Sequence, residues 1–119
     1  MTRPDPALSP AQELRANVAV PFERAFAMPK SVYTSPDFAK LEQQQIFAKD
    51  WLCAGRADAL KVAGDYLTLT IAGEPVIILR DREGRLRGMS NVCRHRMSTL
   101  LDGRGHVRAI VCPYHAWTY

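Results

Sequence analysis

Two short stretches near the end of the chain decide the fold and function that we predict: NVCRHRMSTL (residues 91–100) and VCPYHAWTY (residues 111–119). Each stretch contains one cysteine followed closely by one histidine. The spacing is Cys-x-His in the first and Cys-x-x-His in the second. If the two stretches lie side by side at the tips of two hairpins, two thiolates and two imidazoles converge on one site. We therefore predict that the metal ligands are Cys93, His95, Cys112 and His115.

This ligand set suits two metal ions. A Rieske-type 2Fe–2S centre gives two cysteines to one iron and two histidines to the other. Neutral imidazoles in place of two thiolates make the cluster less negative, which raises its potential from about −400 mV to between about −150 and +300 mV. Pro113 fits this interpretation, because it rigidifies the second loop and leaves neighbouring amides to point at the sulfurs. The predicted activity is one-electron transfer.

A structural zinc site is the alternative for two cysteines and two histidines. The arms of such sites usually read C-x₂₋₄-C and H-x₃₋₅-H. Here each arm mixes one Cys with one His, and the first arm is only Cys-x-His. The arrangement favours the 2Fe–2S centre.

The composition argues against several other classes of protein. The 119 residues, 47% of them hydrophobic and 24% charged, are typical of one globular domain. The N-terminus lacks the apolar region of a signal peptide, and the longest aliphatic run, residues 76–79, is too short to cross a bilayer. Three cysteines without an export signal favour metal binding over disulfides. We expect a cytoplasmic protein that makes no membrane contact.

The net charge of +4 suggests an acidic partner, and eight arginines fall between Arg80 and Arg108. Nucleic-acid binding is the alternative for this basic stretch. No interleaved aromatic residues or recognised module support it, so we expect no nucleic-acid partner.

The first half of the chain predicts an arm and a helix. Residues 1–34 read as an extended N-terminal arm, with one short helix starting at Ser9-Pro10. Ser35-Pro36-Asp37 has the residues of a helix start, so residues 35–50 should form a helix with Phe38, Leu41 and Phe47 as core contacts.

The second half, residues 51–119, predicts a mostly β domain. Alternating or continuous apolar runs predict strands over residues 65–71, 75–80, 86–92 and 107–112. Short strands with frequent turns indicate an antiparallel β sandwich or barrel. The two ligand stretches would form its cluster-binding loops.

At these residues the chain resembles the α subunit of Rieske non-haem iron oxygenases, the aromatic-ring-hydroxylating dioxygenase type. The resemblance runs from about Tyr33 to the end, and Met97 stands where family members often have Gly. The matching segments are FAKDWLCAG (47–55), Gly64-Asp65-Tyr66, the hairpin of residues 76–84, NVCRHR and CPYHAWTY.

The resemblance implies an oxidoreductase in which a reductase or ferredoxin supplies electrons to the Rieske cluster. The cluster would pass them to a mononuclear Fe(II), held by two His and one carboxylate in a following domain, for O₂-dependent hydroxylation of a small organic substrate. It also implies a homo-oligomer, a trimer in the full-length protein. That catalytic domain should lie beyond Tyr119, so we expect a C-terminally truncated Rieske domain with no catalytic residue of its own.

Two other carriers of such a cluster were compared with this pattern. The high-potential Rieske proteins of cytochrome bc complexes have an extra Cys in each loop. This chain has Ser98 and Tyr114 at those positions, so we set this alternative aside. A self-standing Rieske-type ferredoxin remains the alternative. The arm and helix before the first strand favour the oxygenase.

The remaining candidate residues have simpler roles. We expect Cys53 to be a buried thiol in an apolar strand and His106 to be a surface loop residue. Trp117 either shields the cluster from water or fills the core. Arg94 and Arg96 flank a ligand and would stabilise the reduced cluster, dock an acidic ferredoxin, or simply be solvated.

Overall fold

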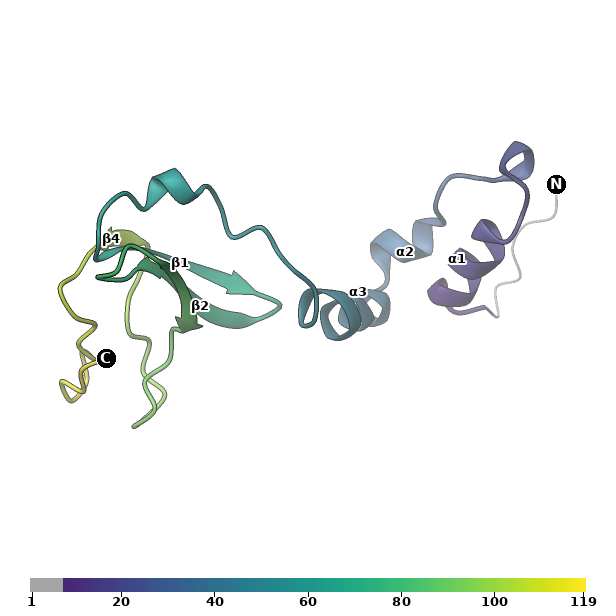
Figure 1. The fold of residues 1–119 in the computed structure, drawn as a ribbon. Coiled ribbons are helices and arrows are strands. Elements are labelled where there is room, and N and C mark those ends of the chain that lie inside the picture. The colour runs from purple at the N-terminus through teal and green to yellow at the C-terminus, as the bar shows by residue number, and fades with distance from the viewer. Residues whose placement is uncertain (1–7) are drawn as a thin grey trace. The chain divides into compact units, whose positions relative to one another are not determined.

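The computed structural model describes residues 8–119, and the chain divides into two compact units, one ending at Asp50 and one spanning Trp51–Tyr119 (Figure 1). No helix in the described residues is long and apolar enough to span a membrane. The first unit contains the helices and the second contains the sheet. Both predicted ligand stretches belong to the second unit.

The first unit begins with helix α1 (Pro10–Val18), which starts where the sequence predicts a short helix. Ser9 and Gln12 form a capping box, in which each side chain accepts from the other residue's backbone amide. The Asn17 side chain pairs with the backbone of Phe26 at 2.9 and 3.1 Å, which ties α1 to the following segment. A 3₁₀ turn η1 (Phe22–Arg24) and helix α2 (Lys30–Thr34) complete the segment, and residues 1–7 of the predicted arm lie outside the described part.

Helix α3 (Pro36–Glu42) begins at the predicted Ser35 cap but ends early, in the π-helical turn η2 (Gln43–Phe47). Phe38 is buried, whereas Leu41 and Phe47, predicted as core contacts, are about two-fifths exposed. A π turn takes in one extra residue, which rotates Phe47 away from the face that an uninterrupted α-helix would give it. Leu41 precedes the turn and is exposed on the regular part of α3. The prediction for Leu41 and Phe47 was wrong within this unit.

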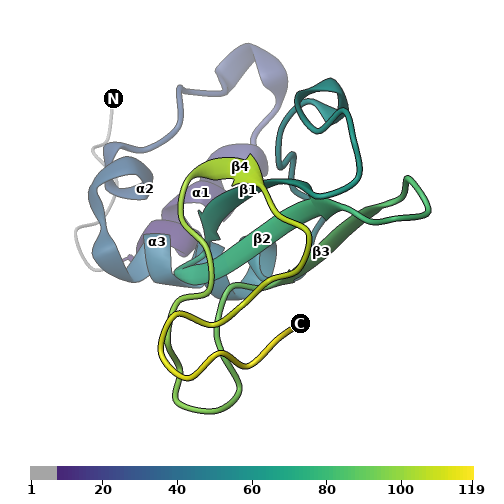
Figure 2. The same ribbon diagram turned by 90° about the vertical axis from the view of Figure 1, so that its left-hand side faces the viewer.

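The second unit is built on one antiparallel sheet in the order β3-β2-β1-β4 (Figure 2). A two-residue turn, Ala72-Gly73, joins β1 to β2, and both turn residues have positive φ, as a type I′ hairpin turn requires. The predicted strands 65–71, 75–80 and 86–92 are confirmed with small shifts, and so is the antiparallel β fold. The strands are β1 (Asp65–Ile71), β2 (Glu74–Arg80), β3 (Leu86–Ser90) and β4 (Arg104–His106).

The strand predicted over residues 107–112 is wrong. The fourth strand ends at His106, and the next residues direct their hydrogen bonds elsewhere. Val107 donates to Gly64, and Ile110 bonds with Tyr119. Because Ile110 closes the base of the second loop with Tyr119, its backbone groups are not available to extend the ladder. His106, predicted in a surface loop, is exposed on β4 with Nδ1 3.1 Å from an Asp65 carboxylate oxygen.

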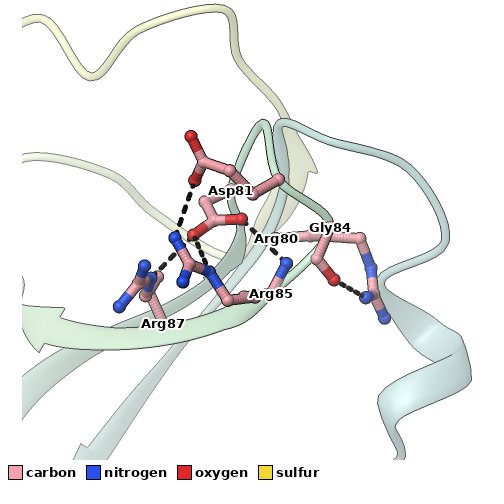
Figure 3. Close-up of polar contacts among 6 residues, drawn as sticks. Arg80, Asp81, Gly84, Arg85 and Arg87 are labelled. Atoms are coloured by element: carbon pink, nitrogen blue, oxygen red, sulfur yellow. Dashed lines mark hydrogen bonds and ion pairs between the residues drawn. The ribbon is translucent and has the colours of Figure 1, made fainter.

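The β2–β3 turn is held by the Asp81 carboxylate and by the guanidinium groups of Arg80 and Arg87 (Figure 3). Asp81 accepts from the Arg85 amide at 2.8 Å and from the Arg87 side chain at 2.7 Å. The Arg87 hydrogen bond lowers the pKa of Asp81 to about 2. Arg80 donates to the Gly84 carbonyl and reaches the Leu60 carbonyl, next to the 3₁₀ turn η3 (Ala57–Ala59). This network fixes the end of the sheet opposite the β1–β2 turn.

The segment WLCAG was predicted to be a strand with a buried thiol. It has no regular secondary structure, and Cys53 is exposed. Within the described residues of this unit, β1 is paired on both sides by β2 and β4, and no strand pairs with residues 51–55. An apolar run is buried only when a neighbouring surface covers it, so the prediction for Cys53 was wrong.

The buried core lies on one face of the sheet and includes two of the predicted ligands. Ile77 of β2 is fully buried, and Leu79 and Met89 on the same face pack against the group. The core residues are Ile77, Cys93, Leu100, Ile110 and Cys112. The two ligand stretches therefore rest on the sheet through their cysteines.

Candidate metal centre

The two ligand stretches form loops with the same backbone design. In each loop the cysteine amide donates to a carbonyl five residues later, at 2.8 Å from Cys93 to Ser98 and 2.8 Å from Cys112 to Trp117. A single antiparallel bridge closes each loop: Val92 with Thr99, and Val111 with Thr118. Both loops extend from the same end of the sheet (Figures 1 and 2). Two equivalent arms are therefore presented together.

Each loop also contains one residue in the left-handed conformation, four positions after its cysteine. Met97 has φ 56° and donates its amide to the Cys93 carbonyl at 2.9 Å. Ala116 has φ 58° and makes the same bond to Cys112 at 3.0 Å. Left-handed backbone costs an L-residue roughly 1–2 kcal/mol. Gly, which the resembled family often has at the Met97 position, would adopt this conformation freely.

The loops place the thiols inside and the imidazoles outside. Cys93 and Cys112 are 1% and 3% exposed, whereas His95 and His115 are exposed at the loop tips. The two imidazole rings come from different loops, yet their centroids are 4.8 Å apart. The structure thus places the two histidines beside each other and the two cysteines in one core cluster.

Aromatic side chains of the second loop pack against the histidines. The Trp117 ring stacks on His95 of the first loop, with centroids 5.1 Å apart and planes within 7°. The Tyr114 ring lies 3.8 Å from the ring of His115. Trp117 is half exposed, so it covers the imidazole face and does not fill the core. The sequence left these two roles open.

The Cys93 sulfur lies among hydrogen-bond donors. The Tyr119 hydroxyl is 3.1 Å from Cys93 Sγ and accepts from the Arg94 amide at 3.0 Å. The Tyr119 hydroxyl lowers the pKa of Cys93, and the His95 amide and the Cys112 thiol act in the same direction. The same contact raises the pKa of Tyr119. The arrangement favours a thiolate that accepts from a neutral phenol.

This donor set fits a 2Fe–2S cluster. A Rieske centre takes one pair of thiolates on one iron and one pair of imidazoles on the other, and the loops separate the two pairs in this way. The buried cysteine pair would hold one iron and the exposed histidine pair the other.

Sequence reasoning missed two residues of the site. Tyr119 and Asn91 were not singled out, although each has a counterpart in the other loop. Asn91 lies two residues before Cys93, and Ile110 lies two before Cys112. Tyr119 lies seven residues after Cys112, and Leu100 lies seven after Cys93. An alignment of one loop on the other would have drawn attention to these positions.

The surface around the histidines is basic and partly apolar. Arg94 and Arg96 are exposed and are the charged side chains between Cys93 and Thr99, while residues 112–118 carry no Arg, Lys, Asp or Glu. Met97 and Tyr114 are more than half exposed beside them.

Comparison with known proteins agrees with the geometry. The model of the family described as "Rieske [2Fe-2S] domain" matches residues 50–119. The chain is 39% identical over 113 residues to the glycine betaine monooxygenase oxygenase subunit of Pseudomonas aeruginosa, covering 94% of this chain and 26% of that protein. It is 43% identical over 100 residues to the chloroplastic choline monooxygenase of Atriplex hortensis, covering 84% and 23%.

The fold has similar solved structures. The quaternary ammonium Rieske monooxygenase CntA, crystallised with its substrate gamma-butyrobetaine, superposes with a TM-score of 0.76 at 40% identity. That match covers 90% of this chain and 30% of the other. The chain thus spans about a quarter of the length of the curated relatives that it matches.

Proposed function

Because this chain belongs to the Rieske [2Fe-2S] domain family, we propose that Cys93 and Cys112 bind one iron of its cluster and that His95 and His115 bind the other. The observation that supports this assignment is the pairing of two matched loops, with buried thiols and exposed imidazoles. Bound there, the cluster would supply one-electron redox chemistry at a potential above that of all-cysteine clusters. The domain is then an electron carrier.

The chain's own residues adjust this centre in three ways. Tyr119 donates a hydrogen bond to Cys93 Sγ, which stabilises negative charge on the sulfur. Trp117 covers one face of His95 and excludes water from it. The exposed imidazole edges leave the histidines within reach of a partner's surface. Electrons would enter or leave through these edges.

The full-length protein, in this proposal, is the oxygenase subunit of a Rieske system. A reductase or ferredoxin would supply electrons, and a following domain would hold a mononuclear iron for O₂-dependent hydroxylation. The relatives reported above are monooxygenases or their oxygenase subunits, which favours this role over a self-standing ferredoxin. The similar solved structure is that of a quaternary ammonium Rieske monooxygenase, which supports a small quaternary ammonium compound as the substrate. The full-length protein, in this proposal, forms a homo-oligomer, a trimer, in the cytoplasm.

The assignment of ligands is tested by reconstituting the chain with iron and sulfide. We expect two irons and two acid-labile sulfides per chain, and a rhombic EPR signal after reduction. Cys93→Ser and Cys112→Ser should each abolish the signal. Cys53→Ser is the matched control, because Cys53 is exposed and belongs to neither loop, and it should leave the spectrum unchanged. Stoichiometric zinc without labile sulfide would overturn the proposal.

A further inference from the structure

The two matched loops close differently at their bases. In the second loop, Ile110 and Tyr119 exchange both backbone hydrogen bonds, at 3.1 and 2.8 Å. The equivalent pair in the first loop is Asn91 and Leu100. Leu100 donates to the Asn91 carbonyl at 3.3 Å, but the Asn91 amide donates to Pro75 of β2 at 2.8 Å. The first loop therefore has one backbone bond fewer across its base, because Asn91 also pairs with the sheet.

The Asn91 side chain replaces what the backbone lacks. Its Oδ1 accepts from the amides of Leu100 at 3.2 Å and Leu101 at 2.9 Å, and its Nδ2 donates to the Leu101 carbonyl at 2.8 Å. Asn91 is 3% exposed and is the one buried polar or charged residue among residues 8–119. A buried carboxamide with these three bonds is costly to remove, because its partners would be left unsatisfied.

We propose that Asn91 is the positioning residue of the first ligand arm, and that its carboxamide sets where Cys93 and His95 stand relative to Cys112 and His115. This inference rests on the proposed ligand assignment. Cys93 follows Asn91 by two residues, and Leu100 and Leu101 are the residues at which the loop returns to the core. Holding both ends of the loop fixes the span in which the two ligands lie. The second loop needs no such residue, since its backbone closes it.

The first test uses hydrogen exchange, with the second loop as an internal control. In Asn91→Ala, amide exchange in residues 91–101 should be about tenfold faster, whereas residues 110–119 should change less than about twofold. Leu67→Val is the matched control: Leu67 is buried on β1 but lies outside the core cluster that contains the cysteines. It should affect both loops equally. Equal acceleration of both loops in Asn91→Ala would reduce Asn91 to a general stabilising residue and overturn the proposal.

The second test reads the cluster itself. Asn91→Ala should change the reduction potential and the EPR g values of whatever cluster the chain retains, and Leu67→Val should change neither. Asn91→Asp keeps the acceptor for the two amides but loses the donor to Leu101, so its exchange rates should fall between those of wild type and Asn91→Ala. If Asn91→Ala does not fold, the exchange rates and the potential are measured on Asn91→Asp instead. An unchanged potential and spectrum in Asn91→Ala would contradict the proposal.

The two proposals fail in different ways. If wild type takes up no labile sulfide, the ligand assignment fails. The exchange comparison on the same 119-residue chain still decides whether Asn91 holds the first loop. If wild type binds the cluster normally and Asn91→Ala matches it in exchange, potential and spectrum, only the positioning role fails.

Discussion

The Tyr119 hydroxyl lies between the Arg94 amide and the Cys93 sulfur. A hydrogen bond to a cluster sulfur stabilises the reduced, more negative state and raises the potential. Tyr119→Phe should therefore lower the reduction potential, by about 1 kcal/mol or roughly 40 mV for one electron. Protein-film voltammetry would measure the shift. Tyr114→Phe is the control: the Tyr114 ring packs on His115, so an equal drop there would show that the Cys93 contact is not the cause.

The left-handed backbone of Met97 costs conformational free energy. Its φ of 56° is unfavourable for any residue with a Cβ atom. Met97→Gly should raise the free energy of unfolding by up to about 1 kcal/mol and slow cluster loss. Met97→Ala keeps the Cβ atom and should bring no such gain. Chemical denaturation of wild type and both variants separates the conformational effect from the loss of an exposed side chain. Equal stability of the Gly and Ala variants would show that the left-handed backbone is not the cause.

At the scale of elements, the β2–β3 turn depends on the ionised Asp81. Its folded pKa of about 2 lies below the ordinary value, so the carboxylate stabilises the fold above about pH 4 and loses this contribution as the pH falls towards 2. Arg87→Gln removes the main cause and should move the Asp81 midpoint upwards. A ¹³C carboxyl NMR titration measures it.

The control for this turn is Arg82→Gln. Arg82 lies next to Asp81 in sequence, but no hydrogen bond or ion pair joins the two in the described structure. Arg82→Gln should leave the titration midpoint of Asp81 unchanged. An equal rise in both variants would mean that general positive charge, and not the Arg87 contact at 2.7 Å, holds the pKa down.

The elements also show what the sequence could predict. The strands at residues 65–71 and 75–80 have local signals, namely alternation, an apolar run and turn residues, and these signals were sufficient. Residues 107–112 have an equally apolar pattern, yet Ile110 pairs with Tyr119 and not with the sheet. Cys53 in WLCAG is exposed for a related reason. Hydrophobicity indicates that a segment will pack against another segment. Which segment that is depends on residues far away in the sequence.

The proposed ligands could be identified without knowledge of the fold around them. Cysteine and histidine identities carry the ligand chemistry, and their spacing in two short arms is a local property. What the sequence did not reveal were contacts between the loops: Trp117 on His95, and Tyr119 on Cys93. Both connect residues more than twenty positions apart, and neither has a motif of its own.

At the scale of the whole molecule, the basic tip formed by Arg94 and Arg96 should guide the electron donor. For an acidic ferredoxin, Arg94→Gln with Arg96→Gln should slow reduction of the cluster about tenfold at low salt and weaken the dependence of the rate on ionic strength. Stopped-flow spectroscopy measures both. Arg82→Gln changes the charge on the β2–β3 turn instead and should have little effect. Unchanged rates in the double variant would exclude docking at this tip.

The contacts from the second loop to the first have a consequence for biosynthesis. Translation delivers Cys93 and His95 before Trp117 and Tyr119, the residues that stack on the imidazole and donate to the thiol. The first loop therefore lacks the partners that stack on its imidazole and donate to its thiol until the second loop has folded against it. We therefore expect stable cluster binding to require both loops to be folded, and not the first loop alone.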